Sequence, residues 1–431
     1  MTTRITRRTA LAATSAAAAS FAAPQLARAQ AAQTVRLLNI ETNKDVLAIW
    51  NKAAASFEAK HPNVKIELRT LETEAFKTRL PTILQSDTKP HIFYSWGGGL
   101  VKTQADAGML EDIAPQIDAS ANGKMAKAAI DQFSRDGKVY GLPYNTAEVG
   151  ILINKELFDK AGVTPADVMT WPGFLSAVDK FKKAGIQPLV GGGQDKWQMM
   201  LLYGGINLRL GGRAAIEAAV AGKDGGFENP VFVKGGELYK QLCDMNPYQE
   251  GFMAMKAQPA AGMFADGRAA MLMHGTWFVR QNPSFAADKK GLAADKMGFI
   301  GFPMIPGGRG TAKETQVNIN GWLVSKGAPK IAVEFLQHFL DTEAQGELAA
   351  AGFIVPANLA ARDRLEHPIM KQAANSIASM DFLQTGYNTL LGPSAGKTSD
   401  DVAVGIAAGK TSPQEAAKLL EAARVQDTKA N

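Results

Sequence analysis

The chain has 431 residues, a formal net charge of +6 and a single cysteine, Cys243. One hydrophobic core stops growing at roughly 250 to 300 residues, so this length predicts two lobes. A lone cysteine excludes an internal disulfide, and stability must come from burial. The first 29 residues contain four arginines and no acidic residue, and without them the charge falls to +2. The remaining chain therefore lacks the large positive charge with which proteins bind nucleic acid or anionic membranes.

The first 29 residues have the features of an export signal. Arg7 and Arg8 precede a run of Ala, Leu and Ser, and Ala27-Arg28-Ala29 has the small residues of a cleavage site. The arginine pair favours the twin-arginine route, although Ala10 stands where phenylalanine is usual, and general secretion is the alternative. We expect cleavage after Ala29 and a soluble periplasmic protein. Since no cysteine lies near that site and no later stretch reaches the roughly 18 apolar residues of a membrane span, we expect no anchor.

Strand and helix patterns alternate after the signal. Val35 to Leu38 predicts a strand, and Thr42 is the expected cap of a helix that stops at His61. Alternating apolar residues from Val64 to Leu68 predict a second strand, and this succession is typical of a doubly wound α/β lobe. Later segments predict strands at 149–153, 186–190 and 268–273, and helices at 171–184, from Pro329, and from the capping box Ser412-Pro413-Gln414-Glu415.

Five groups of motifs follow one another along the chain. The sharpest is DGKVYGLPYN at 136–145, followed by INKELFDKAG at 153–162. The others are Thr170-Trp171-Pro172-Gly173-Phe174, residues 264–271 with Gly275-Thr276-Trp277, Gly321-Trp322, and Glu343-Ala344-Gln345. In this order they resemble the extracellular solute-binding proteins of ATP-driven sugar importers, the group that includes maltose- and oligosaccharide-binding proteins.

This resemblance implies two doubly wound α/β lobes that close on a ligand about a hinge. The expected crossings between lobes lie near 143–146, 273–276 and 320–324. The N-terminal lobe would then comprise 34–145 plus 275–322, and the C-terminal lobe 146–274 plus 323–425. The resemblance also implies a monomer without a cofactor, which captures a carbohydrate and delivers it to the permease subunits of an ABC importer.

A sugar site needs flat apolar surface beside side chains that donate and accept hydrogen bonds. Ligands of doubly wound sheets lie beyond the carboxyl ends of strands, so residues at those ends and at the crossings are the candidates. They are Glu41, Trp96, Gly97, Gly98, Tyr144, Asn145, Trp277, Asn320 and Trp322, with Trp197 and Asn388 in loops of the second lobe. The glycines would let backbone N–H groups approach a hydroxyl closely.

Each candidate also has a structural interpretation. Tryptophan is more often a core residue than a ligand platform, and helix patterns assign Trp50 and Trp171 to the core. Gly97 to Gly99 is also compatible with a simple turn, and Glu41 with a solvated acid at a helix start.

Other function classes find less support in the residues. Gly392-Pro393-Ser394-Ala395-Gly396 spells a serine nucleophile elbow, but the last histidine, His367, precedes it, whereas that fold places its histidine after the serine. The overlapping stretch to Thr398 has the wrong spacing for a phosphate loop. The five histidines lack metal-ligand spacing. We therefore expect neither a metal nor catalytic residues.

Two alternatives stay open. A secreted polysaccharide-cleaving enzyme would need two carboxylates across a glycosidic bond, and Glu148 and Asp266 are the pair that could be imagined. A binding protein for ferric iron or a polyamine would need clustered tyrosines or several cleft acids. Only Glu41 and Glu148 lie near the candidates, which favours a neutral sugar.

Overall fold

The computed structural model describes residues 32–117 and 124–429. The predicted signal therefore lies outside the described residues. Within them, no helix has both the length and the apolar character that crossing a bilayer requires.

Among the residues that the structure describes, nine strands form one mixed sheet in the order β2-β1-β3-β10-β6-β8-β7, in which β11 also pairs with β10 and β9 with β6. The neighbours β1 and β2 run parallel, as do β1 and β3, whereas β10 and β6 run antiparallel to each other. The strands are β1 (Gln33–Asn39), β2 (Val64–Thr70), β3 (Ile92–Ser95), β6 (Gly141–Asn154), β7 (Leu189–Val190), β8 (Met271–Gly275), β9 (Met297–Ile300), β10 (Glu314–Val324) and β11 (Phe382–Thr385), besides the small hairpin of β4 (Ser134–Arg135) and β5 (Lys138–Val139).

The predicted first strand, helix and second strand are confirmed. Val35 pairs with Ile66 across the parallel β1 and β2, and α1 (Lys44–Lys60) buries Trp50 and Phe57. Its N-cap is Asn43 rather than Thr42, because the Asn43 side chain accepts from the backbone N–H groups of the first turn.

Two later strands differ from their predicted bounds. The strand predicted at 186–190 is reduced to Leu189–Val190, and the one predicted at 268–273 begins only at Met271. Gly267, with a positive φ of 71°, turns the chain just after α10, and pairing with β6 starts beyond that turn.

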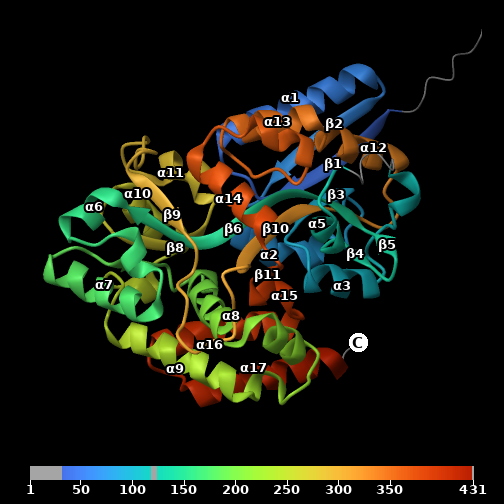
Figure 1. The fold of residues 1–431 in the computed structure, drawn as a ribbon. Helices are drawn as coiled ribbons and strands as arrows, with labels where there is room; N and C mark the ends of the chain where they lie inside the picture. Colours follow the sequence, from blue (N-terminus) through green and yellow to red (C-terminus); the bar gives the residue numbers. More distant parts are fainter. Residues whose placement is uncertain (1–31, 118–123, 430–431) are drawn as a thin grey trace, which may run out of the picture.

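The long strands β6 and β10 run through both halves of the sheet. The start of β6 pairs with the end of β10, and from Val149 onward β6 pairs with β8 and then β9. Likewise, the end of β10 pairs with β3 and its start with β11. Figure 1 shows β6 crossing the middle of the molecule, with helices gathered on either side.

One buried cluster lies around β1, β3 and the helices above them in Figure 1. It joins Val35 and Trp50 with Phe335 and Phe339 of α12, and α1 contacts both α12 and α13. The helices of this half are α1 (Lys44–Lys60), α2 (Thr73–Ile83), α3 (Gly99–Asp106), α5 (Lys127–Asp131), α12 (Lys330–Phe339) and α13 (Thr342–Ala350).

Two further clusters form the other half. One fills the space between β6 and α7, α8, α9, α16 and α17, and the other joins β8 to Phe264, Phe278 and Met370. The helices of this half are α6 (Lys155–Lys160), α7 (Trp171–Lys183), α8 (Trp197–Val220), α9 (Pro230–Asp244), α10 (Ala257–Ala265), α11 (Phe278–Phe285), α14 (Pro368–Ser379), α15 (Tyr387–Leu390), α16 (Pro393–Ala407) and α17 (Pro413–Lys429).

This packing differs from the expected course of the chain. Residues 273–276 do not cross between halves: they end β8, where Gly275 pairs with Val149. The helices α12 and α13 pack against α1 rather than with the C-terminal lobe, where the expected range 323–425 put them. Conversely, α11 packs with α10, although 275–322 had been expected in the N-terminal lobe.

Residues 354–357 form a connection between the halves that the sequence did not indicate. The Asn145 side-chain oxygen accepts from the Val355 backbone N–H at 3.0 Å, and Thr146 N–H donates to the Val355 carbonyl at 2.9 Å. We therefore propose that the N-terminal lobe comprises 32–145 and 320–355, and the C-terminal lobe 146–319 and 356–429.

Replacing Trp322 with Ala should destabilise the N-terminal half strongly. Trp322 is fully buried, and its ring packs edge-on against Trp50 at 5.4 Å and Phe339 at 5.6 Å between centroids. We expect the free energy of unfolding, measured by chemical denaturation, to fall by about 3 to 5 kcal/mol. Leu419→Ala is the control, because Leu419 is 46% exposed and its loss should change little. Equal effects of the two changes would contradict this assignment of the core.

Candidate ligand site

Polar and aromatic side chains meet where β1, β3 and β8 end and where β6 crosses between the halves. Glu41 follows β1, Trp96 follows β3, and Trp277 follows β8. Tyr144 lies in β6 at the irregular pairing opposite Asn320 and Gly321. The carboxyl ends of strands thus bring several of the predicted ligand residues toward one region, as expected for a doubly wound sheet.

Glu41 forms a buried ion pair with Arg280 of α11. Its Oε2 lies 3.3 Å from Arg280 Nε, and both side chains are about nine-tenths buried, with 8% and 10% exposed. The other oxygen, Oε1, accepts from the backbone N–H groups of Thr42 and Asn43 at 3.0 and 2.9 Å. Glu41 is therefore held in place from two sides and is not the solvated acid of the alternative interpretation.

Two half-buried tryptophans lie together in the C-terminal half. The ring centroids of Trp197 and Trp277 are 6.1 Å apart, and His274 packs against both at 5.3 and 4.8 Å. A side chain at position 275 would overlap the Trp277 ring, which therefore lies directly on the backbone of Gly275. Burial lowers the pKa of His274 to about 4, so its imidazole is neutral at pH 7 and its Nδ1 pairs with the Gly275 carbonyl. The group is a firmly supported aromatic surface.

Trp96 supplies a third half-buried aromatic ring, on the N-terminal side. It packs edge-on against Phe76 and Tyr94, and the Lys77 ammonium lies 5.6 Å from its ring centroid. Cation–π attraction and packing both fix the orientation of this ring.

Gly97 and Gly98 differ from the expected backbone cradle. The Gly97 N–H donates to Ser95 Oγ at 3.1 Å and the Gly98 N–H donates to the Gln132 carbonyl at 2.9 Å, so both donors are already used. Both glycines have positive φ, and a side chain on Gly98 would lie 2.6 Å from the Thr389 carbonyl. Their role in the structure is to turn the chain and to allow α15 to approach, which matches the turn interpretation.

The structure places the four crossing candidates in buried surroundings. Asn145 uses its oxygen to hold Val355, and Asn320 is 4% exposed with a buried Oδ1 that has no partner among the described residues. Tyr144 packs against Trp50, and burial is the main cause that raises the pKa of its phenol. Trp322 lies in the same aromatic cluster, so it has the surroundings of a core residue rather than of an exposed platform.

Asn388 lies in α15, next to the contact between the halves. It hydrogen bonds with Asp400, whose pKa is raised to about 7, chiefly by burial, while Lys77 and Asn388 act to lower it. Since Lys77 belongs to α2 and Asp400 to α16, these charges face each other from the two halves.

Sequence reasoning missed Arg280 and Thr276. Arg280 Nη1 and Thr276 Oγ1 are buried and have no hydrogen-bond partner among the described residues. Both belong to the same short segment as Trp277. Their proximity to that tryptophan was the one available signal, because Arg280 within 278–285 otherwise resembles an ordinary charged residue of an amphipathic helix.

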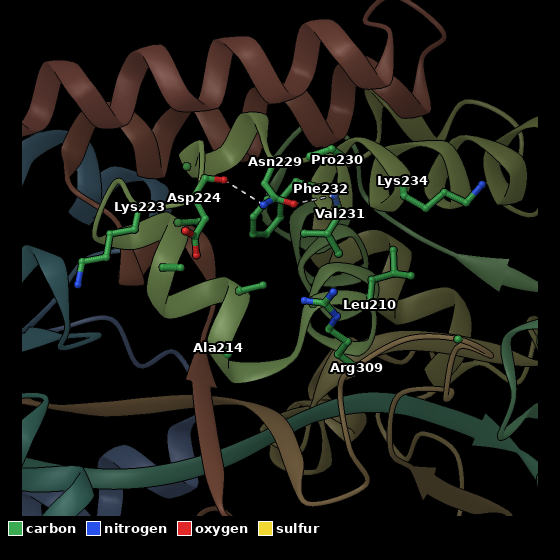
Figure 2. Close-up of a pocket in the computed structure, with 16 residues that line it drawn as sticks. Leu210, Ala214, Lys223, Asp224, Asn229, Pro230, Val231, Phe232, Lys234 and Arg309 are labelled. Atoms are coloured by element: carbon green, nitrogen blue, oxygen red, sulfur yellow. Dashed lines mark hydrogen bonds between the residues drawn. The ribbon is translucent and has the colours of Figure 1, made fainter.

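A separate pocket of about 480 Å³ lies away from this region, between the end of α8 and the start of α9. Figure 2 shows Lys223 and Asp224 on one side of it and Arg309 on another. Asn229 ties its rim together by accepting from Val231 N–H and donating to the Asp224 carbonyl. The predicted ligand residues do not line this pocket.

The carboxylates considered for glycoside hydrolysis have different surroundings. Glu148 is buried and accepts from the hydroxyls of Thr315 at 3.1 Å and Ser376 at 2.8 Å, and burial raises its pKa. Asp266 is exposed and accepts from the backbone N–H of Ala287. Among residues 32–117 and 124–429, no cluster of His, Cys, Asp and Glu has the arrangement of a metal site.

Residues 52–378 match the family described as bacterial extracellular solute-binding protein. The chain belongs to this family. Among solved structures, this solute-binding protein is similar to a chitin oligosaccharide binding protein, with a TM-score of 0.82, 25% identity, and coverage of 93% of this chain and 99% of the other. It also shares its fold with a protein of xylan utilization from Caldanaerobius polysaccharolyticus, with a TM-score of 0.81, 24% identity, and coverage of 92% and 100%.

A probable sugar-binding periplasmic protein of Mesorhizobium japonicum is 35% identical over 183 residues, which are 42% of this chain and 43% of the other. Against the curated relatives, the matched part of this solute-binding protein spans between about a third and two thirds of their length.

The stability of this solute-binding protein should fall with acidification in part through His274. Burial lowers its pKa in the folded state from 6.5 to about 4, so between these values the unfolded chain binds the proton more readily. Stability is therefore lost as the pH falls through this window, by about 2 kcal/mol between pH 6.5 and 5. Denaturation of the wild type and of His274→Gln at both pH values measures the effect. The variant should show a smaller drop, and identical drops would contradict the assignment.

Proposed function

We propose that this chain is the sugar-binding component of an ABC importer, which captures a carbohydrate between its two lobes and delivers it to a membrane permease. The observation that carries this proposal is the aromatic surface of Trp197 and Trp277. Trp277 belongs to the same segment as Thr276 and Arg280, whose buried polar atoms have no partner among the described residues. Flat rings pack on the C–H faces of a sugar, and polar atoms without partners can bind its hydroxyls.

The family and the neighbouring structures support this proposal. The names of the chitin oligosaccharide binding protein and of the probable sugar-binding periplasmic protein both state a carbohydrate ligand. Each hydrogen bond to a sugar adds about 0.5 to 1.5 kcal/mol net, so several of them with ring packing reach the roughly 8 kcal/mol of micromolar affinity.

The proposal includes the absence of catalysis. Glu148 is occupied by two hydroxyl groups inside the fold and Asp266 is exposed at the end of α10, which gives no pair of carboxylates across one bond. We also propose that the mature chain is a monomer, free in the periplasm, and exported by the twin-arginine route.

Calorimetric titration with a panel of carbohydrates tests the function. The panel comprises chito-, xylo- and malto-oligosaccharides, lactose and galactose. The expected result is saturable binding of one class with micromolar or tighter affinity and no release of product. Cleavage of an oligosaccharide, or binding of ferric iron or a polyamine instead of any sugar, would overturn the proposal.

Replacing Trp277 with Ala should weaken the binding of that sugar at least tenfold, because the ring supplies part of the aromatic surface. The melting temperature should change less than for a core tryptophan, since the Trp277 ring is only partly buried. Trp171→Ala is the matched control: Trp171 is buried against Phe174, so this change should lower the melting temperature markedly. A large loss of melting temperature for Trp277→Ala would show that Trp277 is a core residue.

A further inference from the structure

The Glu41–Arg280 pair joins the two halves of the molecule. Glu41 follows β1 beside the N-terminal cluster, whereas Arg280 lies in α11, whose Phe278 and Val279 belong to the cluster around β8. A second contact reinforces the pair, because Asn43 Nδ2 donates to the Arg280 carbonyl at 2.9 Å. The guanidinium therefore lies between the ends of β1 and β8, where the candidate site is located.

The bonds of this pair are unevenly distributed. The Glu41 carboxylate is fully engaged, by Arg280 on one oxygen and by two backbone N–H groups on the other. Arg280 Nε and Nη1, in contrast, are both buried without a hydrogen-bond partner among the described residues; Nε contacts Glu41 through the ion pair, whereas Nη1 has no such contact. Leaving a buried donor unmet costs about 1 to 3 kcal/mol, and more for a charged group. Such a donor is retained in a binding site where a ligand supplies the acceptor.

The charges of the pair cancel within the buried region. Burial is the largest single effect and acts to lower the pKa of Arg280, but Glu41 together with Tyr144 and Tyr94 keeps this pKa above its ordinary value, so the guanidinium stays charged. A carboxylate ligand would meet a guanidinium that is already neutralised and a second negative charge at Glu41. The ligand carboxylate would lose its hydration on binding without gaining an unpaired positive charge in return. A hydroxyl or ring oxygen loses much less hydration and still accepts from Nη1.

We propose that Arg280 contacts the ligand and that Glu41, by neutralising it, selects an uncharged sugar over the corresponding sugar acid. This inference rests on the proposed function and adds to it the class of sugar. Thr276, whose Oγ1 is also buried without a partner among the described residues, and Trp277 precede Arg280 in the same segment and add one hydroxyl and one aromatic ring to this charged donor.

The test compares neutral sugars with their uronates by titration calorimetry. The matched pairs are galactose with galacturonate, glucose with glucuronate, and xylobiose with xylobiose that carries a glucuronic acid substituent. Chito- and malto-oligosaccharides are added to the neutral sugars. The wild type should bind a neutral sugar at least 100-fold more tightly than any uronate. Comparable or tighter binding of a uronate overturns the inference without overturning the proposed function, and absence of binding by every sugar overturns both.

Two substitutions separate the roles of the pair. Glu41→Gln keeps the size of the side chain but removes the counter-charge, so neutral-sugar affinity should fall and uronate affinity should rise, which narrows the ratio to within about tenfold. Arg280→Met keeps the aliphatic bulk, and it should lose at least tenfold in neutral-sugar affinity with no gain for the uronate. An unchanged ratio in Glu41→Gln, or unchanged neutral binding in Arg280→Met, would contradict the inference.

Glu421→Gln is the matched control. Glu421 pairs with Arg424 within α17, and both side chains are 14% exposed, so this change removes a partly buried charge of the same kind outside the site. It should leave both affinities unchanged, and an equal effect of the control would overturn the inference. Melting temperatures report whether each variant folds, and the discrimination of the wild type tests the inference without any variant.

Discussion

The rest of the structure depends on two antiparallel strands, β6 and β10, that belong to both halves at once. Because a strand keeps its hydrogen-bonding register along its length, the pairing of β6 with β10 fixes how the sheet of one half continues into the other. The pairing is irregular at Asn320 and Gly321, next to the point where Asn145 holds the connection at Val355. An irregular ladder bends more easily than a regular one, so we propose this point as the hinge.

That constraint also determines where a ligand can bind. The ends of β1 and β3 come from one half, and the end of β8 comes from the other. The Glu41–Arg280 pair spans them, and Gly98 lies against the Thr389 carbonyl in a second contact between the halves. We propose that a sugar enters when these contacts separate and that it supplies acceptors to buried donors when they form again. Aromatic rings that are half-buried, rather than buried, provide the surface on which it packs.

Local patterns predicted the elements well and their spatial relations less well. The strand, helix and strand from Val35 to Leu68 could be read from periodicity, because the alternation of apolar residues reflects which face is buried. The lobe that contains α12 could not be read in this way, because periodicity shows which face of a helix is buried but not which part of the chain covers that face. Its position follows from contacts with α1, which lies about 270 residues earlier in the chain.

The tryptophans show the same limit within the site. Trp277 and Trp322 each follow a glycine closely, so the sequence does not distinguish them. The strand pairing distinguishes them, because Trp322 pairs with Tyr94 and Leu142 in the middle of the sheet, whereas Trp277 lies just beyond the last residue of β8. Arg280 was missed for a related reason, because only folding brings it to Glu41, which lies far earlier in the chain.

The crystal structure of this protein with its bound sugar tests the account most directly. We predict a sugar between the two halves, with one ring face on Trp277 and an oxygen within hydrogen-bond distance of Arg280 Nη1. A sugar bound elsewhere, such as in the pocket between α8 and α9, with Arg280 Nη1 still unpartnered, would contradict it.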